Sequence, residues 1–279
     1  MAFVSMRRLT IKAAFCLAFA LGAGSLAHAE DALARVKAAG ELKVGTETAF
    51  APFDFIDAGA HVGLNVDVFA EIGKEMGVKI DWVALPWEGV LPGLEAGKFD
   101  MVAGPATITK ARMERYRFLP PIGDATDALL KRKGDTSVMK PEDIAGKTVG
   151  AGKASSQLAQ LQTYAVTLPS RVTVREYVGN SEAYADLAAG RIVAVANSFT
   201  NIAFVAKQRP DTFEVVLPPF GPKSYFGYIA RKDADYASLT DAVQAAILKI
   251  KADGRLATLQ KKWFGAAFDT PDAVPEPSL

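Results

Sequence analysis

The amino-acid sequence predicts an α/β protein built as two lobes of similar design. Short runs rich in Val, Ile and Phe alternate with amphipathic helical segments, a pattern typical of α/β architecture. The order strand, loop, helix, strand, helix, strand, loop occurs twice, at roughly 41–112 and 146–202. In this architecture ligands bind at the carboxyl ends of strands, so we expect a binding cleft between the lobes.

The first repeat contains two helices between buried strands. Apolar residues from Val66 to Met76 recur at near-helical spacing, and a short second helix stops at Gly97. The expected elements are a strand at 41–48, a turn and strand at 49–57, a helix at 64–77, a strand at 79–85, a helix at 87–97 and a strand at 98–104.

The second repeat has the same order of strands, loops and helices, and a long helical segment lies near the end of the chain. We expect that segment to be one helix with a kink at Gly254, and the Pro-rich end of the chain to be disordered. The expected elements are a turn, strand, loop and helix within 139–165, strands at 171–178, 191–198, 212–220 and 224–232, helices at 181–190 and 238–265, and a disordered tail at 270–279.

The first 29 residues read as a secretory signal peptide. A basic start at 1–12 precedes an apolar run at 13–24, and Ala27-His28-Ala29 forms an A-x-A cleavage site. The apolar run is shorter than the roughly 20 residues of a spanning helix. Cys16 lies inside this run and not at a cleavage site. We therefore interpret it as an ordinary residue of the apolar run and not as a lipoprotein cysteine. A buried N-terminal helix is the alternative.

Composition excludes several classes of partner. Cleavage after Ala29 removes Arg7, Arg8 and Lys12, which leaves a net charge near −2 and no cysteine for a disulfide. A near-neutral chain without a basic block argues against nucleic acid. No later segment is apolar enough to span a membrane.

No catalytic or metal-binding motif is evident. The sequence has no CxxC, HExxH, GxSxG or P-loop, and the "GAGK" at 150–153 lacks P-loop spacing. The histidine left after cleavage is His61, which we interpret as an exposed turn residue. We therefore expect no cofactor and no metal.

Arg112 is the residue that local structure explains least. If Thr109 is the N-cap of a short helix, Arg112 occupies N3, where a cation opposes the helix dipole. With Thr107 and free backbone N–H groups beside it, the arginine suits an anionic ligand held by two parallel hydrogen bonds. The alternative is a solvated helix face, since "KARMERYR" is strongly charged.

Other candidate residues each have an ordinary structural explanation. Ser155 and Ser156 lie before a helix and suit either N-caps or a second anion site. Phe50 and Trp87 suit either the core or stacking on a ligand. Glu47 follows a strand and by default is an exposed loop acid.

Several segments together resemble the periplasmic solute-binding proteins for polar amino acids, family 3 of the bacterial solute-binding proteins. They are "LKVGTETAFAPFDF", "GLNVDVFAEIGKEMGVKIDWV", "WEGVLPGLEAGKFDMVAG", "TIT" with Arg112, "SVMKPEDIAGKTVGAGKASS", "FGYIARK" and "IKADGRLATLQKKWFG". The resemblance covers nearly all of the mature chain. It implies a type II clamshell joined by two hinge strands, with lobe 1 at 30–125 plus 228–279 and lobe 2 at 126–227.

The resemblance also implies a function. The protein is expected to bind an amino acid or amino-acid derivative in the periplasm, as a monomer without enzymatic activity. It would pass the ligand to the membrane permease of an ABC importer. The alternative is a periplasmic dehydratase of the cyclohexadienyl dehydratase type on the same scaffold.

The resemblance further assigns the site. Arg112 is expected to clamp the ligand α-carboxylate, with the backbone N–H of Thr107 and of Ser155 or Ser156. Phe50 and Trp87 are expected to sandwich the ligand side chain.

Two further assignments concern the polar ends of the ligand. Glu47 occupies the position of an aspartate that faces the ligand's distal group. The carbonyl of Pro105, which follows Gly104 in the site, and the hydroxyl of Thr107 are expected to accept from the α-ammonium.

One departure bears on the ligand. The family places an aspartate at the end of the strand at 191–198, whereas this chain has Asn197 and Ser198. A buried ammonium without a carboxylate is costly. An opine, whose amine is secondary, is therefore an alternative ligand.

Overall fold

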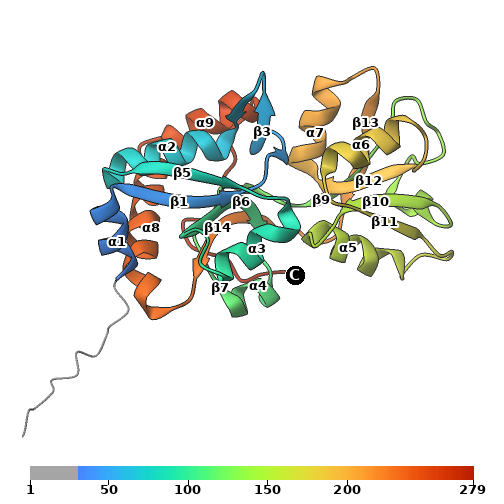
Figure 1. The fold of residues 1–279 in the computed structure, drawn as a ribbon. Helices are drawn as coiled ribbons and strands as arrows, with labels where there is room; N and C mark the ends of the chain where they lie inside the picture. The colour runs from blue at the N-terminus through green and yellow to red at the C-terminus, as the bar shows by residue number, and fades with distance from the viewer. Residues whose placement is uncertain (1–30) are drawn as a thin grey trace, which may run out of the picture.

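The computed structural model describes residues 31–279, which form two α/β bodies side by side (Figure 1). Each body is built on its own sheet. We call the body around the six-stranded sheet lobe 1 and the body around the five-stranded sheet lobe 2. The signal peptide expected at 1–29 lies outside the described residues.

The sheet of lobe 1 has the order β5-β1-β6-β14-β7, with β8 paired to β14. The strands β5, β1 and β6 are parallel, and β14 runs antiparallel to its neighbours. Its strands are β1 (Glu41–Thr46), β5 (Lys79–Ala84), β6 (Met101–Thr107), β7 (Tyr116–Phe118), β8 (Gly123–Asp124) and β14 (Tyr225–Arg231).

Helices cover both faces of this sheet. Met101 and Ala103 of β6 face one core with α1, α2, α8 and α9, while Val102 faces the other core with α3, as the alternation of a strand requires. The helices are α1 (Ala32–Ala39), α2 (Leu64–Met76), α3 (Trp87–Glu95), α4 (Lys110–Arg115), α8 (Ala237–Ala252) and α9 (Arg255–Phe264).

The sheet of lobe 2 has the order β11-β10-β12-β9-β13 and is likewise covered on both faces. Its strands are β9 (Asp127–Arg132), β10 (Thr148–Gly152), β11 (Thr173–Tyr177), β12 (Ala194–Ser198) and β13 (Phe213–Phe220). Its helices are α5 (Ser156–Ala165), α6 (Asn180–Ala188) and α7 (Phe199–Gln208). The helix α5 packs on one face, and α6 and α7 pack on the other.

The chain passes between the lobes twice. It leaves the lobe 1 sheet after β8 and joins the lobe 2 sheet at β9, and it returns between β13 and β14. Because β14 begins at Tyr225, the residues just before the expected boundary at 228 pair with lobe 1. These crossings place the ends of several strands at one interlobe gap.

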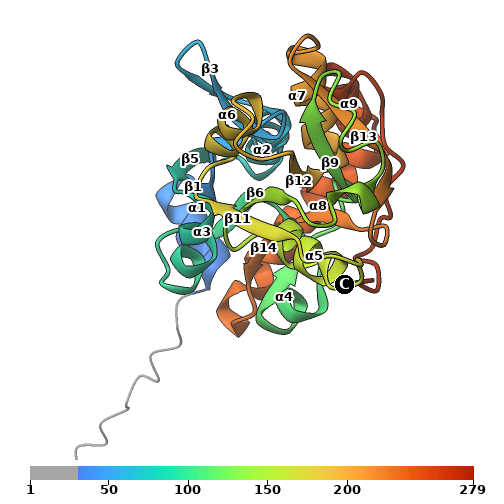
Figure 2. The ribbon, with the colours of Figure 1, turned by 90° about the vertical axis from the view of Figure 1, so that its right-hand side faces the viewer.

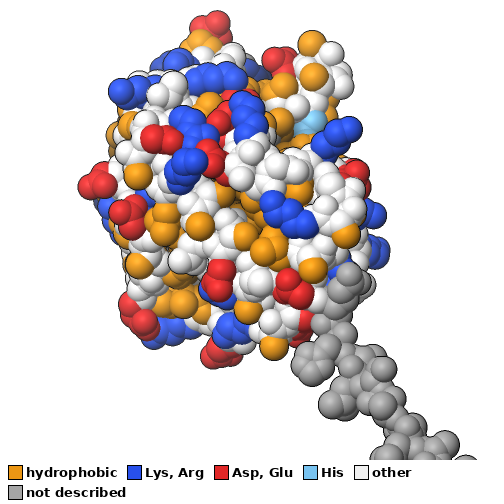
Figure 3. Space-filling model, turned by 90° about the vertical axis from the view of Figure 1, so that its left-hand side faces the viewer, with side chains coloured by type: hydrophobic (Ala, Val, Ile, Leu, Met, Phe, Trp, Pro, Cys, Tyr) orange, Lys and Arg blue, Asp and Glu red, His pale blue; other side chains and the backbone are white. Residues whose placement is uncertain are grey.

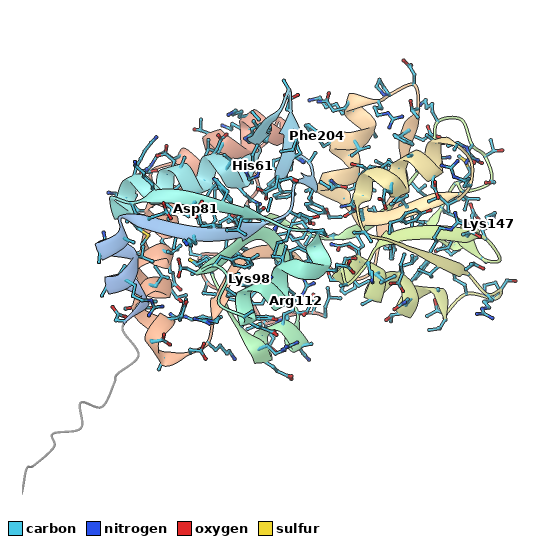
Figure 4. The ribbon with its side chains drawn as sticks, in the orientation of Figure 1. His61, Asp81, Lys98, Arg112, Lys147 and Phe204 are labelled. Carbon is cyan, nitrogen blue, oxygen red and sulfur yellow. The ribbon has the colours of Figure 1, made fainter. Side chains whose placement is uncertain are left out.

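A small antiparallel sheet of three strands extends from lobe 1 toward lobe 2. It comprises β2 (Ala49–Phe50), β3 (Asp54–Asp57) and β4 (Ala60–Val62). Phe55 in it contacts Phe204 of α7, with ring centroids 5.9 Å apart. Figure 4 shows His61 and Phe204 on the two sides of this approach. His61 lies in β4 and not in the turn that we expected.

The C-terminal part differs from expectation in two ways. The expected kinked helix is two helices, because Gly254 between α8 and α9 adopts φ +82°, a left-handed conformation that ends a helix. The segment 270–279, expected to be disordered, has no helix or strand but packs on lobe 1. Lys251 Nζ donates to the carbonyls of Thr270 and Pro271 at 3.0 and 2.6 Å, and Pro277 is buried.

The surface agrees with a near-neutral composition. On the face of lobe 1 in Figure 3, acidic and basic side chains are interspersed. Arg255 illustrates the pattern, since it pairs with Glu71, Glu75 and Asp253 at 2.7 to 2.8 Å. Within residues 31–279, no helix is long and apolar enough to cross a membrane.

Candidate ligand-binding cleft

A narrow cleft lies between the lobes, at the carboxyl ends of β1, β6, β10 and β12. Figure 1 shows these strands running toward the boundary of the two bodies. The lining residues are Glu47, Phe50, Trp87, Pro105, Thr107 and Arg112 from lobe 1, and Gly152, Lys153, Ser155, Ser156, Gln157, Val178, Asn180, Ala196 and Asn197 from lobe 2. Residues far apart in the sequence therefore meet in one space.

Arg112 lies in the first turn of α4 and is held facing the cleft. Thr109 is the N-cap of α4, and its hydroxyl accepts from the backbone N–H of Arg112 at 3.2 Å. The guanidinium donates to the carbonyl of Thr107 at 3.2 Å and lies 5.5 Å from the centre of the Trp87 ring. Figure 4 shows Arg112 on the side of lobe 1 nearest lobe 2.

The charge of Arg112 has no partner of opposite sign in the part of the chain that the structure describes. Burial lowers the pKa of its guanidinium to about 10, so the group stays cationic at neutral pH. Arg112 is half-buried, and a cation that has lost part of its hydration without gaining a carboxylate is stabilised when an anion from outside pairs with it. The arrangement is therefore suited to bind an anionic group.

Hydroxyl groups from both lobes flank this cation. Ser156 Oγ donates to Thr107 Oγ1 at 2.6 Å across the cleft. Ser155 is the N-cap of α5: its hydroxyl accepts from Leu158 N–H, and its own N–H donates to Gly152. Of the two serines, Ser156 thus has the backbone N–H in the first turn of the helix, which finds no acceptor within that helix.

The two aromatic residues line the cleft with one side and join the core with the other. Phe50 packs edge-on against Phe226 at 5.8 Å and belongs to the first core of lobe 1. Trp87 begins α3, and its Nε1 donates to the carbonyl of Ala154 in lobe 2 at 3.3 Å. Both the core and the stacking interpretations of these residues are thus compatible with their positions.

Gly104 belongs to β6 and does not line the cleft. A Cβ at Gly104 would lie 3.2 Å from the ring of Trp87. The glycine therefore leaves room for the tryptophan, whereas the next residue, Pro105, lines the cleft.

Glu47 is buried, not exposed as we expected by default; only 8% of its surface is accessible. Burial and, second, the nearby Asp54 raise the pKa of Glu47 to about 8, so its carboxyl is protonated at neutral pH. Asp54 itself is buried and bonded to His61 Nε2 at 2.9 Å and to Asn65. Burial also raises the pKa of Asp54.

At the end of β12, the residue that lines the cleft is Asn197 and not Ser198. The Asn197 amide donates to Asn180 Oδ1 at 3.2 Å and to the Tyr184 hydroxyl at 3.1 Å. Ser198 is fully buried and is the N-cap of α7, where its hydroxyl accepts from Asn201 N–H at 3.4 Å. The neutral side chain at this wall of the cleft is therefore the Asn197 amide.

Sequence reasoning missed several lining residues of lobe 2. Asn180 begins α6 after β11, and its amide donates to the carbonyl of Ala49 in lobe 1 at 3.3 Å. Its position after a strand was a usable signal, the same one that pointed to Ser155. Lys153 and Val178 also directly follow strands, β10 and β11, whereas Gln157 within α5 and Ala196 within β12 carried no such signal.

Direct contacts across the cleft show that the two lobes are closed on each other. Besides the bonds of Ser156, Trp87 and Asn180, Lys153 Nζ pairs with Glu88 Oε2 at 2.7 Å. In residues 31–279, no group of three His, Cys, Asp or Glu side chains is arranged to hold a metal ion.

Comparisons with known proteins agree with this architecture. The family model of the bacterial extracellular solute-binding proteins, family 3, matches residues 42–266. The L-cystine-binding protein TcyJ of Escherichia coli K12 is 31% identical, over 85% of this chain and 87% of its own.

Two solved structures with TM-scores of 0.75 are similar over nearly their whole length. An ancestral arginine-binding protein bound to arginine is 32% identical, over 81% of this chain and 99% of its own. The ancestral amino-acid-binding protein AncCDT-1, described as a precursor of cyclohexadienyl dehydratase, is 28% identical, over 83% and 99%.

Proposed function

This chain belongs to family 3 of the bacterial extracellular solute-binding proteins, and we propose that it delivers an amino acid or amino-acid derivative to an ABC importer. The single observation that carries the proposal is Arg112, a half-buried cation without an acidic partner in the described chain, in the wall of an interlobe cleft. The arginine-bound ancestral relative and TcyJ, named for cystine, support an amino-acid ligand.

The geometry of the cleft supports the roles that we assign to its residues. Arg112 binds the ligand carboxylate together with the hydroxyl of Thr107 and the first-turn N–H of Ser156. Phe50 and Trp87 pack against the body of the ligand. Closure is a population shift toward the state in which both lobes contact the ligand.

The amine end of the ligand faces a different set of groups. Asn197 supplies a neutral amide on the lobe 2 side, and the carbonyl of Pro105 is an acceptor on the lobe 1 side. Neither of these two groups carries a negative charge, which favours a secondary, substituted amine over a primary ammonium. An opine is therefore the alternative ligand.

Location and partners belong to the same proposal. The basic and apolar start of the chain directs export, and the mature protein works in the periplasm as a monomer. Its partner is a membrane permease of the ABC type, to which the closed lobes present the ligand. We assign 31–125 plus 225–279 to lobe 1 and 126–224 to lobe 2, because β14 pairs with the lobe 1 sheet from Tyr225 onward.

A thermal-shift screen of the mature protein tests this function. Amino acids, opines and other small carboxylates are added singly, and a ligand that binds the folded state raises the melting temperature with its concentration. Calorimetry then gives the Kd of each hit. If no amino acid or derivative binds, the proposal fails.

A second candidate function is dehydration of a cyclohexadienyl acid. It is favoured by the protonated carboxyl of Glu47 inside the cleft, which is the kind of group that serves as a general acid, and by the similarity to AncCDT-1. Incubation with prephenate and arogenate tests it. Turnover that disappears in Glu47→Gln supports the enzyme, and reversible binding without turnover excludes it.

A further inference from the structure

Four polar side chains of lobe 2 are joined by hydrogen bonds at the end of β12. They are Asn180 and Tyr184 of α6, Asn197 of β12 and Asn201 of α7, and each has at most 8% of its surface exposed. The Asn197 amide donates to Asn180 Oδ1 at 3.2 Å and to the Tyr184 hydroxyl at 3.1 Å. The Tyr184 hydroxyl in turn donates to Asn201 Oδ1. We call these four residues the polar network.

Both ends of the polar network reach lobe 1. The Nδ2 group of Asn180 donates to the carbonyl of Ala49 at 3.3 Å, and the Nδ2 group of Asn201 donates to the carbonyl of Ala51. These two carbonyls belong to β2 and to the turn that follows it. Figures 1 and 2 both show β3 of the same small sheet close to α6. The polar network therefore joins the two lobes while they are closed on each other.

The two carbonyls of lobe 1 determine how the amides of the network are oriented. A carbonyl oxygen accepts hydrogen bonds and cannot donate, so the group of Asn180 that faces Ala49 must be its NH2 group. Asn180 therefore presents its side-chain oxygen to Asn197. At the other end, Asn201 presents its oxygen to Tyr184, whose hydroxyl must donate to it and so accepts from Asn197. Both ends thus require the NH2 group of Asn197 to point into the network.

The side-chain oxygen of Asn197 is the part of its amide that has hydrogen-bonding capacity left for a ligand. Both N–H bonds of the amide are used within the polar network. The Oδ1 atom accepts from the backbone N–H of Ser198 at 2.8 Å, which leaves one of the two lone pairs of that oxygen. Because Asn197 lines the cleft, its side chain can accept from a ligand there but cannot donate to one.

We propose that the other three members of the polar network are positioning residues, which make Asn197 a hydrogen-bond acceptor for the amine of the ligand when the lobes close. This inference rests on the proposed binding function and specifies how that site selects its ligand. When the lobes part, Asn180 and Asn201 lose the carbonyls that orient them, and the Asn197 amide is free to turn over. The closed cleft therefore selects a ligand with an N–H donor at this wall, whether its amine is primary, as in an amino acid, or secondary, as in an opine.

Calorimetry with amine-free analogues tests this selection. Each amino acid is compared with the acid that lacks only its amine, as L-arginine with 5-guanidinopentanoate and L-glutamine with glutaramate. We call the ratio of the two affinities the amine preference. In the wild-type protein it is expected to be about 100-fold or more, because a charged amine donates both to Asn197 and to the carbonyl of Pro105. Equal binding of an amino acid and its analogue would overturn the inference.

Tyr184→Phe tests the positioning role. The variant removes the hydroxyl that accepts from Asn197, so the Asn197 amide can turn over, and the amine preference is expected to fall about tenfold. Asn197→Ala lacks the amide, and adding Tyr184→Phe to it is expected to leave the amine preference unaltered, because a positioning residue acts through the group that it orients. An unchanged preference in the single variant, or a further fall in the double variant, would contradict this role.

Two more variants complete the test. Asn201→Leu removes the oxygen to which Tyr184 donates, so that hydroxyl can donate to Asn197 instead, and the amine preference is expected to fall as in Tyr184→Phe. Glu88→Gln is the matched control, because Glu88 pairs with Lys153 across the cleft but belongs neither to the lining nor to the polar network. It is expected to weaken both ligands of a pair equally. An equal fall of the amine preference in Glu88→Gln would show that closure alone sets it, and would overturn the inference.

The outcomes separate this inference from the proposed function. Binding of amino acids with an amine preference that survives both Tyr184→Phe and Asn201→Leu overturns the inference and leaves the proposed function standing. Absence of binding by every amino acid and opine overturns both.

Discussion

The side-chain hydroxyls of Thr107 and Ser156 lie 2.6 Å apart and join the two lobes by a hydrogen bond. Thr107 ends β6 and Ser156 begins α5, so the bond lies directly beside Arg112. In the proposed binding mode, a carboxylate on Arg112 accepts from the same hydroxyls. In that mode, ligand binding would exchange a bond between the lobes for bonds from each lobe to the ligand.

Arg112→Ala is expected to weaken binding of any carboxylate ligand by about 100-fold or more. The variant removes charge-assisted hydrogen bonds worth about 1.5–3 kcal/mol each. Arg115→Ala is the control, because Arg115 lies on the same helix but is 65% exposed and pairs with Glu95. Calorimetry measures both affinities, and unchanged binding in Arg112→Ala refutes the assigned carboxylate site.

Asn197→Asp is expected to strengthen binding of free amino acids about tenfold, because it adds a carboxylate to the wall of the cleft that we propose faces the α-ammonium. Ser198→Asp is a matched control on the neighbouring residue, which does not line the cleft. A gain in Ser198→Asp but not in Asn197→Asp would place the ammonium elsewhere.

Glu47 is expected to couple binding of a cationic group to release of a proton. Its pKa of about 8 means that at pH 6–7 the carboxyl must ionise to pair with the cation. The affinity should therefore rise by about tenfold per pH unit toward pH 8 and then level off. Calorimetry in two buffers with different ionisation enthalpies counts the protons released. No release, in wild type as in Glu47→Gln, would show that the ligand cation does not face Glu47.

The same carboxyl is expected to make the ligand-free protein less stable as pH rises. Its pKa is 4.5 in the unfolded chain and about 8 in the folded one, so the folded state binds more protons between these values. The stabilisation is complete below pH 4.5 and is lost as pH rises through 8. Glu47→Gln should therefore melt higher than wild type at pH 8 and gain least at pH 4.5. The opposite order of melting temperatures would contradict a buried, protonated Glu47.

Local patterns predicted much of this molecule. The N-cap at Thr109 and the position of Arg112 in the first turn of α4 are confirmed, because capping depends on residues close in sequence. The break at Gly254 was located but interpreted as a kink, since a glycine permits either outcome and packing selects one.

Local patterns did not predict which residue at the end of β12 lines the cleft. At the end of β12, two adjacent polar residues differ in role: one caps α7 and the other lines the cleft. Sequence spacing does not distinguish them, because the direction of each side chain depends on where the strand ends and the helix begins.

By itself the sequence determined the α/β class, the repeated half-pattern and the cation that needs an anion, because these depend on local periodicity and residue chemistry. Only the tertiary structure decided that Glu47 is buried beside Asp54 and that Asn197 faces the cleft. Each of these depends on how distant segments enclose a space. A side chain that is enclosed by distant segments loses contact with water. This loss shifts its pKa and so determines which charge it presents to a ligand.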